Sequence, residues 1–436
     1  MSFAVASLPF VSVADPTIRD EGALDPLGLA TVSDRLADWV LPGVTARMSR
    51  PRFLTAIAVS AALCEGLDDR PSGDGVTPAT TVFEWLVVEG FARRAQRPDV
   101  RQTPGIEKVS AAVKADMRMS SRAYLKTPSV FGFHGVYKRL AQHLGLVDDE
   151  LRLNENGFHL LRVWEREQAL DGFADGKGSV FRSWRDAFVD AYEKGYSTRS
   201  AGWQGWEQFA VHLSPSHIGQ REAESLWQLL LDVGGDRRGE VFKLVENPAS
   251  RTVMADSLSD LDSVLCLSPQ SSPELAARWR VIQAFESFGG CIEDGFEWMQ
   301  FLSTRAGSQP LSPTDFMNEP RVRQLTEQLP ALHRNAVKLL ADVPGQIPDM
   351  FARIASGFEF IADARGLFEA LLQRHGAVQK AKPPEGKRAW FERAADDRVM
   401  VRLPYRRGEP PLDIPFWRRT YRLRTAVLSF CNDLRR

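Results

Sequence analysis

The stretch Tyr137–Glu165, YKRLAQHLGLVDDELRLNENGFHLLRVWE, decides how the first half of the chain is interpreted. Its first part has apolar residues at helical spacing and ends at Gly145, a residue suited to the left-handed conformation that closes a helix. Leu151 and Leu153 then alternate with polar residues, as in a short strand, and the Asn-Gly pair at 156–157 is typical of a tight turn. A second helical pattern follows. This order of elements predicts a winged helix-turn-helix unit.

In a winged helix of this kind, the last of three helices enters the DNA major groove. Helices expected at 81–96 and 106–125 supply the first two, so His134–Leu144 is the expected recognition helix. Its outward side is predicted to carry side chains that can contact phosphates or base edges, and the wing is predicted to add others. The predicted contacts are His134, Lys138, Arg139 and Gln142 on the helix, with Arg152 and Asn154 near the wing.

Two other interpretations of this stretch stay open. Winged helices also serve as protein–protein modules, and an acidic wing is poorly matched to a phosphate backbone. The same pattern is also typical of a packed helical corner that binds nothing. The acidic residues of the expected wing are Asp148, Asp149, Glu150 and Glu155.

The rest of the chain predicts a mainly α fold. After Trp164, apolar residues recur at intervals of three and four, and alternating β-branched residues are rare. The best strand candidate is Arg398–Tyr405, RVMVRLPY. We therefore expect a multi-helix protein with an embedded winged unit and a short β element near the C-terminus. The expected segments are an N-terminal helical segment (1–70), a winged-helix domain (71–170), a helical domain (171–378) and a basic C-terminal arm (379–436).

The composition is that of an ordinary globular protein, with 44% apolar and 25% charged residues among 436. The four cysteines are scattered, which favours a reducing compartment over a disulfide framework or a zinc site. The longest apolar stretch, FLTAIAVSAALCEGL, is interrupted by Glu65 and is too short to span a membrane. The first residues lack the basic region of a secretory signal. These features predict a cytoplasmic protein.

A formal net charge of -1 conceals two basic segments. Residues 91–140 hold eleven Lys and Arg against three Asp and Glu, and residues 380–436 hold fifteen against seven. Such segments favour contact with a polyanion at two places, or else neutralisation of acidic surfaces of the same molecule. In the second segment, FWRRTYRLR predicts a basic helix with outward arginines, which are Arg418, Arg419, Arg422 and Arg424.

Motifs for catalysis are scarce. The sequence has no G-x-x-x-x-G-K-[ST] phosphate loop, no G-x-S-x-G elbow and no H-E-x-x-H. Asp99, Glu107 and Lys108 follow the order found in metal-dependent nucleases, but Glu107 and Lys108 are adjacent and would point to opposite sides of a strand. We expect a non-enzymatic role with no cofactor and no metal, and a nuclease is the less favoured alternative.

A set of residues near the N-terminus carries a family resemblance: Asp25, Leu27-Gly28-Leu29, Asp34, Leu41-Pro42-Gly43, Arg50 and Arg52-Phe53. With a weaker echo in AYLKTPSVFGFHGVYKRL, the segment Arg19–Leu54 resembles the start of an uncharacterised bacterial family, a domain of unknown function. The resemblance covers about the first third of the chain. Members of that family tend to be encoded among phage-defence genes beside helicases, nucleases or methyltransferases. The resemblance therefore implies an accessory subunit of an anti-phage defence complex, and it carries over no catalytic residue.

Two hypotheses for function follow from the sequence. The first is a non-enzymatic subunit that binds DNA through the winged helix and the basic arm, with other defence proteins as partners and no membrane contact. Duplex DNA is favoured over single-stranded DNA as its ligand. The second is a protein–protein scaffold in which the same two elements dock on acidic partners.

Overall fold

The computed structural model describes residues 25–67, 70–232, 237–257, 259–307, 309–383, 386–394, 397–412 and 419–435. The mainly α fold predicted from the sequence is confirmed, and the described residues contain one two-stranded sheet near the C-terminus. The chain divides into two compact units, each discontinuous in sequence. Unit 1 comprises Met1–Leu36 and Ser272–Arg419, and unit 2 comprises Ala37–Ser271 and Thr420–Arg436. The boundary at Leu36 falls within α1 (Ala30–Val40).

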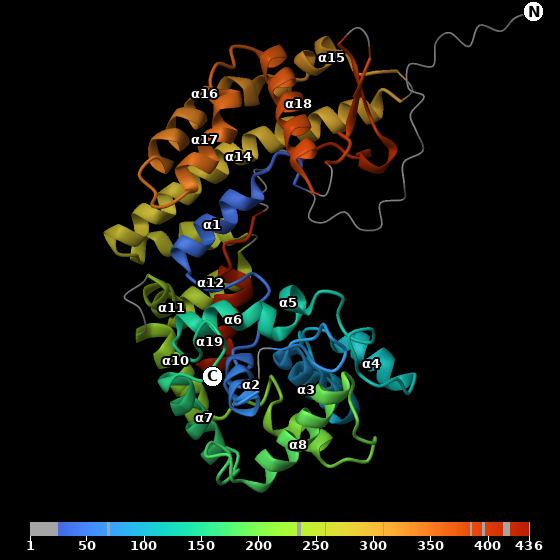
Figure 1. Ribbon diagram of the computed structural model, residues 1–436. Helices are drawn as coiled ribbons and strands as arrows, with labels where there is room; N and C mark the ends of the chain where they lie inside the picture. The colour runs from blue at the N-terminus through green and yellow to red at the C-terminus, as the bar shows by residue number, and fades with distance from the viewer. Residues whose placement is uncertain are drawn as a thin grey trace, which may run out of the picture. The chain divides into compact units, whose positions relative to one another are not determined.

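Unit 1 is organised around one long helix, α14 (Pro273–Arg305). The helix begins where the Ser272 hydroxyl accepts a hydrogen bond from the Leu275 N–H at 3.2 Å, a common N-terminal cap. Helices α16 and α18 pack along it, as Figure 1 shows, and bury rings such as those of Phe285 and Phe288. The other helices of this unit are α15 (Pro313–Asn318), α16 (Pro320–Leu340), α17 (Ile347–Ala355) and α18 (Ala364–Ala381), with 3-10 turns at Ser356–Phe358 and Leu403–Tyr405.

The small sheet of unit 1 pairs β1 (Phe391–Arg393) with β2 (Val399–Val401) in antiparallel register. It is joined to α14 by the Val401 N–H, which donates to the Ser303 hydroxyl at 2.8 Å. The strand predicted at 398–405 is therefore present but short. It gives way to the 3-10 turn, which contains Pro404, a residue with no N–H to donate to a neighbouring strand.

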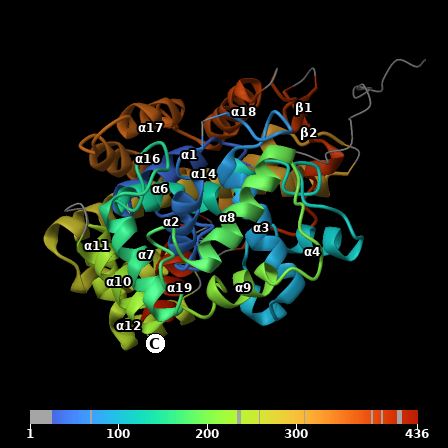
Figure 2. The same cartoon turned by 60° about the horizontal axis from the view of Figure 1, so that its bottom comes forward.

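Unit 2 is built around two helices that are buried along most of their length. Helix α2 (Phe53–Cys64) is buried from Phe53 to Leu63, and α3 (Ala79–Arg94) is buried from Thr81 to Phe91. Helices buried on every side lie in the interior of a domain, and the two buried carboxylates of α3, Glu84 and Glu89, are hydrogen-bonded there. Helices α6, α7 and α8 surround α2 in Figure 2, and α4 and α9 pack against α3.

The surrounding helices of unit 2 follow in chain order and are mostly amphipathic. None of the helices described in either unit is long and apolar enough to cross a membrane. The elements are α4 (Ile106–Lys114), α5 (Pro128–Phe131), α6 (Phe133–His143), α7 (Glu155–Glu167), α8 (Ser179–Lys194), α9 (Gly205–His212), α10 (Gln220–Asp232), α11 (Arg238–Glu246), α12 (Pro248–Asp256), α13 (Asp260–Leu267), a π-helical turn at Leu423–Val427 and α19 (Leu428–Leu434), with 3-10 turns at Arg97–Val100 and Ser268–Gln270.

A buried ion pair joins α2 to α10 in the interior of unit 2. The Arg52 guanidinium lies 3.2 Å from the Glu222 carboxylate, and their side chains are 1% and 0% exposed. Burial raises the pKa of Glu222, while the charge of Arg52 opposes that rise. The same guanidinium donates to the carbonyl oxygens of His212 and Ser214 at 2.9 Å and to that of His217. One arginine thus neutralises a carboxylate and fixes the loop between α9 and α10.

Candidate nucleic-acid interface

Helix α6 is the expected recognition helix, and its inner face is fully used by the core. Phe133, Val136, Tyr137 and Leu140 are buried there against α2 and α3. On the outer face, the Arg139 guanidinium donates to Asp38 at 2.8 Å, and the Gln142 amide donates to the Asp149 carboxylate at 3.3 Å. Lys138 is half-buried and has no side-chain partner in the described part of the chain. Of the four predicted contacts on this helix, Arg139 and Gln142 are thus engaged with carboxylates within the molecule.

The expectation that His134 faces outward is wrong. His134 is 6% exposed, its backbone N–H donates to Glu84 at 2.6 Å, and its Nδ1 lies 2.9 Å from the same carboxylate. The Tyr124 hydroxyl donates to the other Glu84 oxygen at 2.8 Å. Burial, reinforced by the neighbouring Glu84, raises the pKa of Tyr124 well above its usual range. Glu84 therefore anchors the first turn of α6 to α3, a role that sequence spacing could not show.

The segment expected to form the wing is a small non-helical loop. Val147 and Leu153 form one antiparallel bridge, and the Asp148 N–H donates to the Arg152 carbonyl at 3.0 Å. The turn expected at 156–157 is instead the first turn of α7, where the Asn156 amide donates back to the Leu144 carbonyl at 2.8 Å. Arg152 and Asn154 are exposed on this loop.

The C-terminal arginines do not form the outward basic helix expected from the sequence. Arg418 lies outside the described residues, and Arg419 is 10% exposed, with its guanidinium 2.7 Å from both Glu286 and Glu293. Arg422 is buried, has a left-handed backbone with φ of 71°, and lies 3.4 Å from Asp38.

Asp260 explains where the last helical segment starts. Its carboxylate accepts the Leu423 and Arg424 N–H groups at 3.2 and 2.9 Å and the Thr420 hydroxyl at 2.9 Å. This carboxylate caps the helical segment that begins at Leu423, so the segment starts after Arg419 and Arg422 rather than before them. Arg424 is half-buried in its first turn.

One segment of unit 2 with an excess of exposed positive charge runs from the end of α3 to α5. Seven cationic residues are exposed in this region, against two exposed acids, Glu107 and Asp116. We call these seven residues the basic surface: Arg94, Arg101, Lys108, Lys114, Arg118, Arg122 and Lys126. The charge count of residues 91–140 locates this region in the sequence, but it does not distinguish exposed cations from paired ones.

Most of the basic surface is free of intramolecular neutralisation. Lys108 donates to the Tyr124 carbonyl, and Arg94 donates to the Ala201 carbonyl at 3.0 Å, but neither group carries a negative charge. Four members make no hydrogen bond or ion pair with any described residue through their side chains: Arg101, Lys114, Arg122 and Lys126. Their charges remain available to an external anion.

The residues considered for a nuclease do not form a metal site. Asp99 is half-buried and lies 3.5 Å from His217, whereas Glu107 is exposed in the first turn of α4. Among the described residues, no group of three or more His, Cys, Asp or Glu side chains could hold a metal ion.

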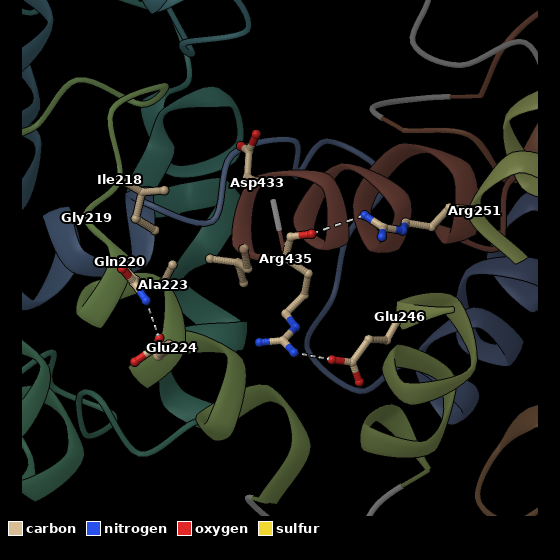
Figure 3. A pocket seen from close by; sticks show the side chains of 10 residues that line it. Ile218, Gly219, Gln220, Ala223, Glu224, Glu246, Arg251, Asp433 and Arg435 are labelled. Carbon is tan, nitrogen blue, oxygen red and sulfur yellow. Dashed lines mark hydrogen bonds and ion pairs between the residues drawn. The ribbon is translucent and has the colours of Figure 1, made fainter. Parts of the chain in front are cut away.

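Figure 3 shows a pocket of about 610 Å³ in unit 2, between the start of α10 and the C-terminal segment. The Arg435 guanidinium lies 2.6 Å from Glu246, and Arg251 donates to the Arg435 carbonyl at 3.3 Å. Gln220 donates to Glu224 at 3.0 Å. Arg435 and Glu246 therefore pair with each other at this pocket, and Asp433 pairs with Arg50 at 3.0 Å.

Comparison with known proteins adds no relative. No protein-family model, no curated protein and no solved structure matches the chain. Function is therefore inferred from the geometry.

Proposed function

We propose that this protein is a DNA-binding accessory subunit that contacts the phosphate backbone through the basic surface. The observation that carries the proposal is the group of four exposed cations without a partner in the described part of the chain: Arg101, Lys114, Arg122 and Lys126. A cation that is already paired must give up its partner to bind a phosphate, whereas these four need only release bound water and counterions.

This proposal keeps one part of the winged-helix hypothesis, a contact between α6 and the phosphate backbone. In this proposal helix α6, the bridged loop and α7 serve as recognition helix, wing and following helix, and Lys138 is the α6 side chain that would reach a phosphate. Arg139 and Gln142 are held by Asp38 and Asp149, so base reading by this helix is not part of the proposal. A place in an anti-phage defence complex, beside a helicase, nuclease or methyltransferase, rests on the resemblance of residues 19–54.

The proposal predicts binding that depends steeply on salt. Each phosphate neutralised on duplex DNA contributes about -0.9 to the slope of log K against log salt concentration. Replacing three contacting cations should therefore make the slope less negative by roughly three and should weaken binding at about 50 mM salt by tenfold or more.

The test compares two triple variants by fluorescence anisotropy on a labelled duplex. Lys114→Ala, Arg122→Ala and Lys126→Ala together remove part of the basic surface. The matched control replaces three exposed cations of unit 1, Arg334, Lys338 and Lys380, and so makes the same change in net charge. Only the first variant should bind the duplex more weakly and show a less negative slope of log K against log salt concentration. The absence of binding to duplex and single-stranded DNA alike at the lowest salt, or equal losses in both variants, would overturn the proposal.

An acidic protein partner is the competing occupant of the same surface. It would be indicated by binding of poly-glutamate, lost in the first triple variant, together with no binding of any nucleic acid.

A further inference from the structure

Large apolar side chains are exposed close in sequence to members of the basic surface. Contact with phosphates alone does not account for their exposure. Met117 is 48% exposed, Val130 is 41% exposed and Phe131 is 49% exposed. Each lies within a few residues of an exposed cation, Met117 next to Arg118 and Phe131 shortly after Lys126. Exposed cationic and apolar side chains therefore both occur within residues 114–131.

Two guanidinium groups lie over aromatic rings at the same region. Arg47 lies 4.5 Å from the centre of the Phe131 ring, and its side chain donates to the Val130 carbonyl at 3.1 Å. Arg118 lies 5.3 Å from the centre of the Tyr196 ring. A β-bridge between Ser120 and Tyr196 fixes that ring beside the segment. A partly exposed aromatic ring beside a cation offers a surface on which an unpaired base can stack.

The ligand that uses both features is a nucleic acid with unpaired bases. In a duplex the bases are stacked inside and the outer surface consists of phosphates and sugars, so exposed rings gain little from contact with it. Unpaired bases stack on aromatic side chains, and each such contact is worth about 1–3 kcal/mol, while the backbone is held by cations. Sequence-tolerant single-strand sites combine these two kinds of side chain.

The contacts made by α6 also favour a single strand over a duplex as the ligand. Reading a duplex needs a helix or strand that is free to enter a groove. The outer face of α6 is engaged by Asp38 and Asp149, and His134 is turned inward.

We propose that the basic surface takes a single-stranded segment of nucleic acid, with phosphates at Lys114, Arg122 and Lys126 and unpaired bases on Phe131 and Tyr196. This inference rests on the proposed function and specifies its ligand. It reverses the preference for duplex DNA expected from the sequence.

The experiment compares a labelled 20-nucleotide oligo-dT with a 20-base-pair duplex, at salt from about 50 to 300 mM. The wild-type protein should bind the single strand at least tenfold more tightly. Phe131→Ala should weaken single-strand binding by about 5- to 150-fold, the range of one lost stacking contact, and should change duplex binding little. Phe131→Trp, which keeps an aromatic ring, should restore it.

The matched control is Phe360→Ala in unit 1, where the ring is 86% exposed. This variant should bind both ligands as the wild type does. Equal affinity for single strand and duplex, or no effect of Phe131→Ala, would overturn the inference while leaving the proposed function intact. If the protein binds neither the single strand nor the duplex, both this inference and the proposed function are overturned.

Discussion

The backbone N–H of Trp390 donates a 2.8 Å hydrogen bond to Nε2 of His375, whose Nδ1 lies 3.0 Å from the Pro26 carbonyl oxygen. A carbonyl can only accept, so Nδ1 carries the proton and Nε2 offers its lone pair. These contacts require the neutral ring, and burial lowers the pKa of His375 to about 4. One side chain thus links the N-terminal segment of unit 1 to the residue that precedes β1.

The first prediction is that unit 1 loses stability as the pH falls from about 6.5 to 4. Between these pH values His375 binds a proton in the unfolded chain but not in the folded chain, so acid favours unfolding. Above a pH of about 6.5 the neutral histidine makes its full contribution to the free energy of unfolding. Over the whole window the loss is about 3 kcal/mol. Urea unfolding followed by tryptophan fluorescence at several pH values measures it.

His375→Gln should be less stable than the wild type at neutral pH and should show a shallower pH dependence. His159→Gln, at an exposed position, should behave as the wild type. If His375→Gln keeps the full pH dependence, another group is responsible.

A second prediction concerns the Arg52–Glu222 pair. Arg52→Met leaves a buried carboxylate and three carbonyl groups without their donor, so it should destabilise unit 2 by about 3–5 kcal/mol. Glu222 then takes up a proton more readily, so the penalty should be smaller at acidic pH than at alkaline pH. Arg52→Met with Glu222→Leu should recover part of the loss. Denaturant unfolding of all three proteins tests this, and an unchanged midpoint for Arg52→Met would contradict it.

Many of the helices were predictable, although the one expected at 106–125 ends at Lys114, whereas the partners of the side chains were not. Helical spacing places the helix around Val136 and Leu140 correctly, and it also marks Lys138, Arg139 and Gln142 as outward. It cannot show that a carboxylate distant in sequence, Asp38, holds Arg139.

The same limit applies to the candidate site. The charge count indicates a basic region at 91–140, and the exposed members of that region form the basic surface. The second basic segment has a similar charge count, but Arg419 and Arg422 are buried against carboxylates there. Composition reports how many charges are present, and only the fold decides which of them remain unpaired.

The third prediction is that Arg419→Ala affects stability rather than binding. Removal of this guanidinium takes a 2.7 Å ion pair from Glu286, whose side chain is 1% exposed. The expected loss is about 2–4 kcal/mol in the unfolding of unit 1. Affinity for nucleic acid should stay at the wild-type value, as measured by anisotropy on folded protein. Lys126→Ala is the matched comparison, and it should lower affinity without a loss of stability.

The fourth prediction concerns Glu84, which joins α3 to Tyr124 and α6. Tyr124→Phe removes one donor and should cost about 1 kcal/mol, and Glu84→Gln places an amide group among donors and should cost about 1–3 kcal/mol. Because the two residues share one hydrogen bond, the loss in the double variant should be smaller than the sum of the single losses. A double-mutant cycle by denaturant unfolding measures this coupling, and strict additivity would show that the hydrogen bond contributes nothing.

The last prediction separates Lys138 from its neighbour Arg139 on α6. Lys138 has no side-chain partner among the described residues, so Lys138→Ala should weaken duplex binding and make the salt slope less negative by about 0.9, the value for one phosphate. The Arg139 guanidinium is 53% exposed but is held 2.8 Å from Asp38, so Arg139→Ala should change the affinity less. It should also change stability by less than about 1 kcal/mol, as is usual for an exposed pair. Anisotropy over a series of salt concentrations distinguishes the two variants. Equal losses of affinity would mean that Arg139 leaves Asp38 on binding and that the outer face of α6 meets DNA as a recognition helix.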